Sequence, residues 1–155
     1  MNLLSTIRAA GRDDVPRLQE IAAETDLFPP EALPEMISPY LDGAAPDLWF
    51  GADAGGALVS LGFAAPEALT DRTWNLLALA VDPGAQGGGI GKAMLLWIER
   101  RLREDDERLL LVETLGSPEF APQRAFYAAA GFVEEGRIRD YYEDGGDKVV
   151  FAKRL

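Results

Sequence analysis

The residues whose spacing best suits chemistry are four glycines followed by a lysine. Gly87, Gly88, Gly89 and Gly91 lie within five positions, and Lys92 follows them. Apolar side chains then recur at helical spacing, so the loop should open a helix. A helix N-terminus presents unpaired N–H groups at the positive end of its dipole, and glycine lets an oxyanion approach the backbone closely. The segment therefore predicts a phosphate-binding loop.

The two best-known nucleotide-binding loops do not fit this segment. A Walker A loop needs a glycine five residues before Gly91 and Ser or Thr after Lys92, where this chain has Gln86 and Ala93. In the Rossmann fingerprint, the third glycine position would be held by Lys92 or Met94. A phosphotransferase that binds a magnesium nucleotide is therefore disfavoured.

Composition narrows the chemistry further. The chain has 155 residues, neither Cys nor His, and a net charge of -11. It therefore has no thiolate or imidazole, and it lacks the usual ligands of zinc sites, so we expect no metal. The negative charge disfavours nucleic acid and anionic membranes as partners. The length suits a single domain over 1–155, and the absence of a signal peptide or a membrane-spanning apolar run favours a cytoplasmic protein.

Periodicity predicts alternating strands and helices. Turn residues at 53–56 and 143–147 indicate two hairpins, and prolines at 34 and 39 should interrupt a short second helix. The expected strands are 5–10, 48–52, 57–64, 73–81, 108–114, 132–141 and 148–154, and the expected helices are 13–24, 31–41, 89–103 and 121–130. This order predicts a mixed sheet with helices on both faces.

Two of these strands should border the site. The run 73–81 is almost wholly apolar, as expected at the centre of a covered sheet, and the run 108–114 is similar. We expect the two strands to be parallel and to splay near Val81 and Glu113, leaving unpaired backbone groups between them. Mixed α/β sheets bind ligands at such carboxyl ends of strands.

Two motifs give the chain a family resemblance. Gln86, Gly89 and Gly91 follow 81–83 in the pattern Gln/Arg-x-x-Gly-x-Gly/Ala, and 125–132 contains Phe-Tyr-x-x-x-Gly-Phe. In this order and on these elements, they resemble the GCN5-related N-acetyltransferase (GNAT) family. The specific motifs lie between about residues 77 and 132.

The resemblance implies a fold and an activity. The fold is α/β (α+β), a mixed and mostly antiparallel sheet of six or seven strands with a central parallel pair and about four helices on both faces. The implied activity is N-acetyl transfer from acetyl-coenzyme A, a co-substrate, to a small-molecule or peptide amine, and homodimers are common in the family. The implied cofactor-binding residues are Leu79, Ala80, Val81, Gln86, Gly87, Gly88, Gly89, Ile90, Gly91 and Lys92.

The resemblance also assigns Tyr127 as the general acid that protonates the departing thiolate. Many members carry Asn seven residues earlier, where this chain has Phe120. We therefore expect Gln123 or Arg124 to supply a polar contact to the cofactor instead.

The general base is less directly indicated. Glu113 ends a buried strand, where it could act directly or through a water. Asn75, Asp140, Tyr141 and Glu143 are rivals from neighbouring segments. Since the chain has neither Cys nor His, we expect the amine to attack the thioester directly in a ternary complex. The alternative is a protein of the same fold that binds acyl-coenzyme A without turnover, as a sensor or regulatory module.

Overall fold

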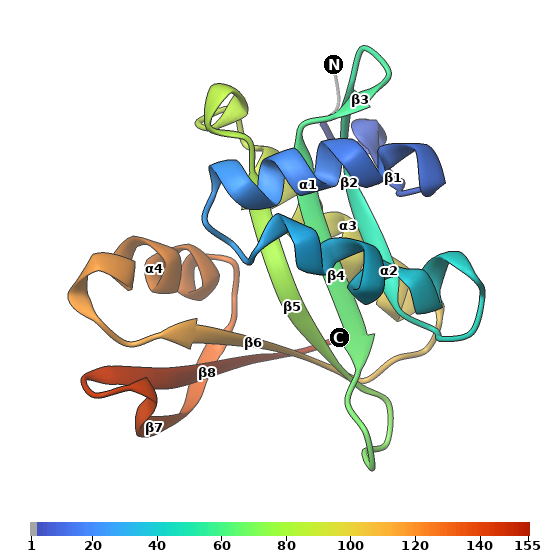
Figure 1. Ribbon diagram of the computed structural model, residues 1–155. Coiled ribbons are helices and arrows are strands. Elements are labelled where there is room, and N and C mark those ends of the chain that lie inside the picture. Colours follow the sequence, from blue (N-terminus) through green and yellow to red (C-terminus); the bar gives the residue numbers. More distant parts are fainter. Residues whose placement is uncertain (1–2) are drawn as a thin grey trace.

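The computed structural model describes residues 3–155, which form a sheet with helices on each side (Figure 1). The strands are β1 (Ile7–Ala9), β2 (Leu48–Ala54), β3 (Ala57–Leu58), β4 (Ser60–Pro66), β5 (Thr73–Val81), β6 (Leu109–Leu115), β7 (Val133–Glu143) and β8 (Gly146–Arg154). The α-helices are α1 (Val15–Glu24), α2 (Leu33–Leu41), α3 (Ile90–Glu104) and α4 (Ala121–Ala129).

The sheet is mixed and mostly antiparallel. Its order is β1-β2-β4-β5-β6-β8-β7, and the short β3 pairs with β2 off this path. Within the described residues, β5 and β6 are the parallel pair, and the other neighbours are antiparallel. The predicted fold class is confirmed, and the two-residue β3 raises the sheet to eight strands.

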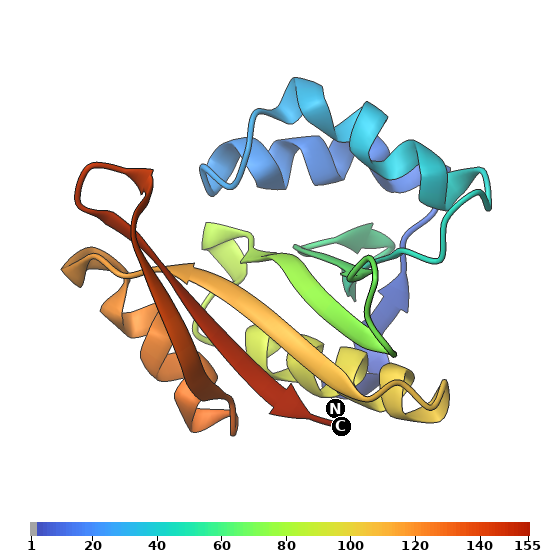
Figure 2. The same ribbon diagram turned by 90° about the horizontal axis from the view of Figure 1, so that it is seen from below.

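The helices divide between the two faces of the sheet (Figure 2). One core contains Leu18 and Ile21 of α1 and Leu33 and Ile37 of α2. The other core contains the apolar stripe of α3, together with residues of α4 and the sheet. Because each face has its own core, the central strands are covered on both sides, as their apolar sequences predict.

The parallel pair separates halfway along its length. Thr73–Leu76 pair with Leu109–Val112, and no further pairs join the two strands. β5 remains paired with β4 as far as Val81, and β6 with β8 as far as Leu115. The expected splay is therefore present. The backbone N–H and C=O groups of 77–81 that face β6 do not pair with those of 113–115 that face β5.

Three expected elements differ from the structure. The strand expected at 57–64 is divided at Val59 into β3 and β4. The segment expected as a strand at 5–10 begins with a 3-10 helix, Leu3–Thr6, and only Ile7–Ala9 extend along β2. Pro34 and Pro39 do not interrupt α2. Pro34 lies in the first turn, where a missing N–H costs nothing, while Pro39 is accommodated inside the helix because Leu33 and Ile37 anchor it in the core.

None of the helices in residues 3–155 is both long and apolar enough to cross a membrane.

Candidate functional site

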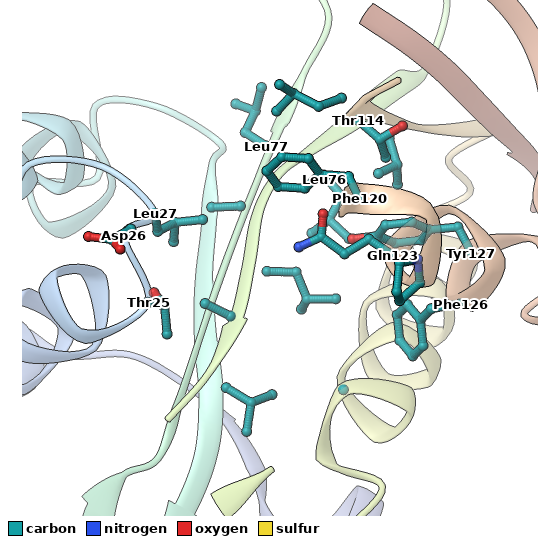
Figure 3. Close-up of a pocket in the computed structure, with 18 of the residues that line it drawn as sticks. Thr25, Asp26, Leu27, Leu76, Leu77, Thr114, Phe120, Gln123, Phe126 and Tyr127 are labelled. Atoms are coloured by element: carbon teal, nitrogen blue, oxygen red, sulfur yellow. The ribbon is translucent and has the colours of Figure 1, made fainter. Parts of the chain in front are cut away.

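A cavity of about 680 Å³ occupies the gap between β5 and β6. Its lining comes from both sides of the sheet, as Figure 3 shows. Thr25, Asp26 and Leu27, after α1, lie on one side, and Gln123 and Tyr127 of α4 lie on the other. This cavity, the passage, is therefore lined by residues from both faces of the sheet.

Tyr127 lies among aromatic rings at this passage. Only 9% of its surface is exposed, and its ring makes edge contacts with Phe126 and Phe132, at centroid distances of 5.2 and 5.6 Å. Burial raises the pKa of Tyr127 to about 12. The phenol therefore keeps its proton at neutral pH and can donate it to a group in the cavity.

The loop between β6 and α4 fixes the position of this helix. Arg124 donates from Nη1 to the carbonyl oxygens of Leu115 and Ser117, at 2.6 and 2.9 Å. Its guanidinium thus stabilises the loop, and Arg124 is not among the cavity-lining residues, whereas Gln123 is. Of the two residues expected to replace the family's asparagine, the structure brings Gln123 to the cavity.

The glycine loop has the geometry of an anion-binding helix terminus. Gly89 caps α3 in the left-handed region, with φ of 85°, and no side chain caps the helix. The N–H groups of the first turn, Ile90 to Lys92, therefore have no intrahelical acceptors. Gln86 braces the loop by donating from Nε2 to the Val81 carbonyl at 3.0 Å.

Two glycines near this end of the cavity differ in the space beside their backbone. At Gly87, with φ of 85°, a β-carbon would have no neighbour within 4 Å, so the backbone stands clear. At Gly91, a β-carbon would lie 3.4 Å from the ring of Phe126. Of the residues expected to bind the cofactor, those that line the cavity are Leu79, Ala80, Val81, Gln86, Gly91 and Gln123. Gly87, Gly88 and Gly89 lie in the loop beside the cavity, and Ile90 and Lys92 lie in the first turn of α3.

Glu113 lines the same cavity and is held by two donors. Its Oε1 accepts from Asn75 Nδ2 at 3.2 Å and lies 3.0 Å from Lys148 Nζ. Burial works against the charge of Lys148, but the hydrogen bond and charge of Glu113 outweigh it and raise the pKa of this lysine. Asn75 Nδ2 also donates to Glu67 Oε1 at 2.7 Å, so one amide joins two carboxylates.

The rivals for the base divide into two groups. Asn75 contacts Glu113, and Tyr141 contacts it through Lys148, whose ammonium lies 4.3 Å from the ring centroid. Asp140 instead accepts from Gly145 N and orders the β7–β8 turn, and Glu143 ends β7 in the same turn. Burial and the nearby charge of Glu113 also raise the pKa of Tyr142.

Several cavity residues carried no sequence signal. Leu77 is 49% exposed at the point where β4 pairs first with Ala78 and then with Leu76, so it bulges out of β5. A bulge depends on how a strand is paired with its neighbour. The uniformly apolar sequence of β5 therefore gives no sign of the bulge at Leu77. Glu24 at the end of α1 and residues 25–27 after it reach the cavity because α1 packs across the sheet.

Within residues 3–155, no group of three or more potential ligand side chains could hold a metal ion.

The chain resembles known proteins over nearly its whole length. Residues 45–134 match the model of the acetyltransferase (GNAT) domain. A GNAT-family protein from Desulfovibrio desulfuricans is 26% identical, with 96% of this chain and 97% of that chain covered and a TM-score of 0.88. No curated protein shows significant sequence similarity.

Two more distant structures share the fold. The ribosomal-protein-alanine N-acetyltransferase of Brucella melitensis is 23% identical, with 96% and 99% of the two chains covered and a TM-score of 0.78. A GNAT family acetyltransferase from Elizabethkingia anophelis, solved with acetyl-CoA bound, is 17% identical, with 78% and 82% covered and a TM-score of 0.65.

Proposed function

This chain belongs to the GNAT acetyltransferase family, and from that premise we propose that it transfers the acetyl group of acetyl-coenzyme A to a primary amine. The acceptor is a small molecule or a peptide, and it attacks directly while both substrates are bound. The passage between β5 and β6 carries this proposal, because residues from both faces of the sheet line it and Tyr127 and Glu113 are among them.

The residues on the α3 and α4 side would bind the cofactor. The N-terminus of α3 would hold its pyrophosphate through the backbone amides of the glycine loop. The unpaired edge of β5 at Leu79, Ala80 and Val81 would bond the pantetheine arm as an added strand. Gln123 reaches the cavity from α4 and would supply a polar contact.

Bound acetyl-coenzyme A supplies a thioester, whose carbonyl carbon accepts the amine and whose sulfur departs as a thiolate. Tyr127 would give its proton to that sulfur, since the phenol is protonated at neutral pH and lines the cavity. Glu113 would take a proton from the amine, directly or through a water. Asn75 and Lys148 would hold its Oε1 and leave Oε2 turned to the acceptor.

Release of free thiol during incubation with acetyl-coenzyme A and a panel of amines tests this proposal. We expect release to depend on one class of amine and acetylated amine to form in equal amount. Tyr127→Phe should lower kcat by about a hundredfold with nearly unchanged cofactor affinity, because an acid for the leaving group acts in the transition state. Phe132→Leu is the matched control for packing, because this ring contacts Tyr127 but does not line the cavity.

A sensor of acyl-coenzyme A would behave differently. It would bind the cofactor in calorimetry, release no thiol with any amine, and keep its response in Tyr127→Phe. That result would replace the proposed transferase by a binding protein of the same fold.

A further inference from the structure

The glycine loop has few contacts that could hold it in place. A β-carbon at Gly87 would have no neighbour within 4 Å, and one at Gly88 would lie 4.0 Å from the Ala85 carbonyl oxygen. Glycine also loses more conformational freedom on ordering than any other residue. The position of the loop therefore depends on the segments at its two ends, which are the 3-10 turn Pro83–Ala85 and α3.

Asp82 shapes the turn that precedes the loop. Its Oδ1 accepts from the Gly84 N–H at 2.9 Å, and its carbonyl oxygen accepts from the Ala85 N–H at 2.8 Å. Its own N–H donates to the Val59 carbonyl at 2.9 Å, which ties the turn to the junction of β3 and β4. Asp82 therefore sets the direction in which the chain leaves β5 and enters the glycine loop.

Arg17 of α1 holds Asp82 from a different element. Its Nη2 donates to Asp82 Oδ2, and its Nε donates to the Leu58 carbonyl at 2.9 Å. Leu58 directly precedes Val59, so the hydrogen bonds join α1, the turn and the β3–β4 junction in a closed ring. The Arg17 and Asp82 side chains are 24% and 22% exposed, so their contact is largely shielded from water. The Gly84 amide and then the Arg17 guanidinium lower the pKa of the Asp82 carboxyl, which therefore stays charged at neutral pH.

We propose that Arg17 is a positioning residue of the cofactor site, which holds the glycine loop ready for the pyrophosphate through Asp82. Neither Arg17 nor Asp82 lines the cavity, so both act through the turn between them and the loop. A loop that is already ordered loses less freedom when it binds a ligand, and the affinity is higher for that reason. This inference rests on the proposed binding of acetyl-coenzyme A at the loop.

An ion pair that only fastened α1 to the sheet would contribute to stability and leave cofactor affinity unchanged. Arg8 of β1 provides the comparison, because it also binds two carboxylates, those of Asp14 and Asp53, at 2.8 and 2.7 Å. β1 is the first strand of the sheet, and these three residues do not line the cavity. The two arginines therefore separate a contribution to stability from a contribution to the site.

Calorimetry with acetyl-coenzyme A on four chains tests the proposal: the wild type, Arg17→Gln, Asp82→Asn and the double variant. Asp82→Asn keeps an oxygen for the Gly84 N–H and removes the charge that faces Arg17. Each single variant should bind about tenfold more weakly than the wild type. The double variant should bind about as weakly as either single variant, because loss of one partner already breaks the contact.

Two control variants should keep the affinity of the wild type to within about twofold. Arg8→Gln should lower the midpoint of urea unfolding without weakening cofactor binding. Glu20→Gln removes the other carboxylate that Arg17 contacts, at 3.0 Å, on a side chain that is 63% exposed. Thermal unfolding verifies that each variant is folded, and if either Arg17→Gln or Asp82→Asn does not fold, the other variant tests the same contact.

The outcomes distinguish this inference from the proposed function. A wild type that does not bind acetyl-coenzyme A would contradict both. If the wild type binds, three results would overturn the positioning role alone. These are unchanged affinity in Arg17→Gln and Asp82→Asn, a double variant whose loss is the product of the two single losses, and an equal loss of affinity in Arg8→Gln.

Discussion

Tyr127 and Glu113 approach the same cavity from contrasting surroundings. Aromatic rings enclose the phenol, and its burial favours the neutral form. The carboxylate of Glu113 instead contacts the ammonium of Lys148 and the amide of Asn75. The proposed acetyl transfer to an amine needs a proton donor and a proton acceptor, and these two side chains would supply them.

The burial of Tyr127 predicts a loss of stability in alkali. Its pKa is about 12 in the folded chain and about 10 in the unfolded chain. A raised folded pKa gives stability that is present below pH 10 and lost as pH rises through 12, so by pH 12 the loss from this residue should reach about 2 kcal/mol. Urea unfolding at neutral and alkaline pH should show that Tyr127→Phe lacks this component. Tyr141→Phe, at a tyrosine that is 52% exposed, should lose stability as the wild type does.

Glu113→Gln removes the carboxylate and keeps the size of the side chain, so it tests whether the reaction needs the carboxylate. Glutamine can still accept from Asn75 and Lys148, so we expect the fold and cofactor affinity to persist while kcat falls by about a hundredfold. Steady-state kinetics over a pH series measures this effect. Glu67→Gln is the matched control, because Glu67 bonds to the same amide but does not line the cavity. An unchanged rate and pH profile in Glu113→Gln would transfer the role of base to Tyr141, Glu143 or a water.

The helix α3 contributes its first turn to the candidate site. The left-handed Gly89 turns the chain from the loop into the helix and leaves the amides that follow it open. β5 and β6 contribute their separation, which turns two paired strands into the walls of a passage. The site therefore depends on where one helix begins and where one ladder of hydrogen bonds ends.

Gly89→Val should weaken acetyl-coenzyme A binding by more than about tenfold, since a branched side chain disfavours the left-handed cap and blocks phosphate approach. Calorimetry on the folded variant measures the affinity. Gly43→Val introduces the same strain at φ of 69°, in open space after α2, so it should cost stability without changing affinity. Equal affinity in both variants would refute the assignment of the loop.

In the molecule as a whole, Lys153 of β8 connects α3 and α4 to the sheet. Glu99 of α3 is 1% exposed and lies 2.5 Å from Lys153 Nζ of β8. The same ammonium donates to the Ala130 carbonyl at the end of α4, at 2.7 Å. α3, which begins with the glycine loop, and α4, which carries Tyr127, are thus held to the sheet at a common point.

Glu99→Ala should lower the free energy of unfolding by about 3 kcal/mol, because Lys153 would keep a largely buried charge without its carboxylate. Urea titration measures the loss. Glu104→Ala removes an exposed carboxylate from the same helix and should cost less than about 0.5 kcal/mol. Similar values for the two variants would show that the buried pair contributes little.

The sequence alone determined the features that depend on neighbouring residues. The strand 73–81 has the predicted bounds, and α3 and α4 lie within one residue of theirs. Apolar periodicity, turn glycines and helix-starting prolines act over a few residues, so they can be read without a structure. The glycine loop at the start of α3 and the two family motifs are features of this kind, and the fold class followed from them.

The contacts between residues distant in sequence could be identified only from the folded chain. The bulge at Leu77 and the parting of β5 from β6 depend on register between strands distant in sequence. The pairing of Glu113 with Lys148 joins β6 to β8, and the turn of Arg124 toward Leu115 follows from the shape of one loop. Such contacts depend on how whole elements pack, and many packings satisfy the same local pattern.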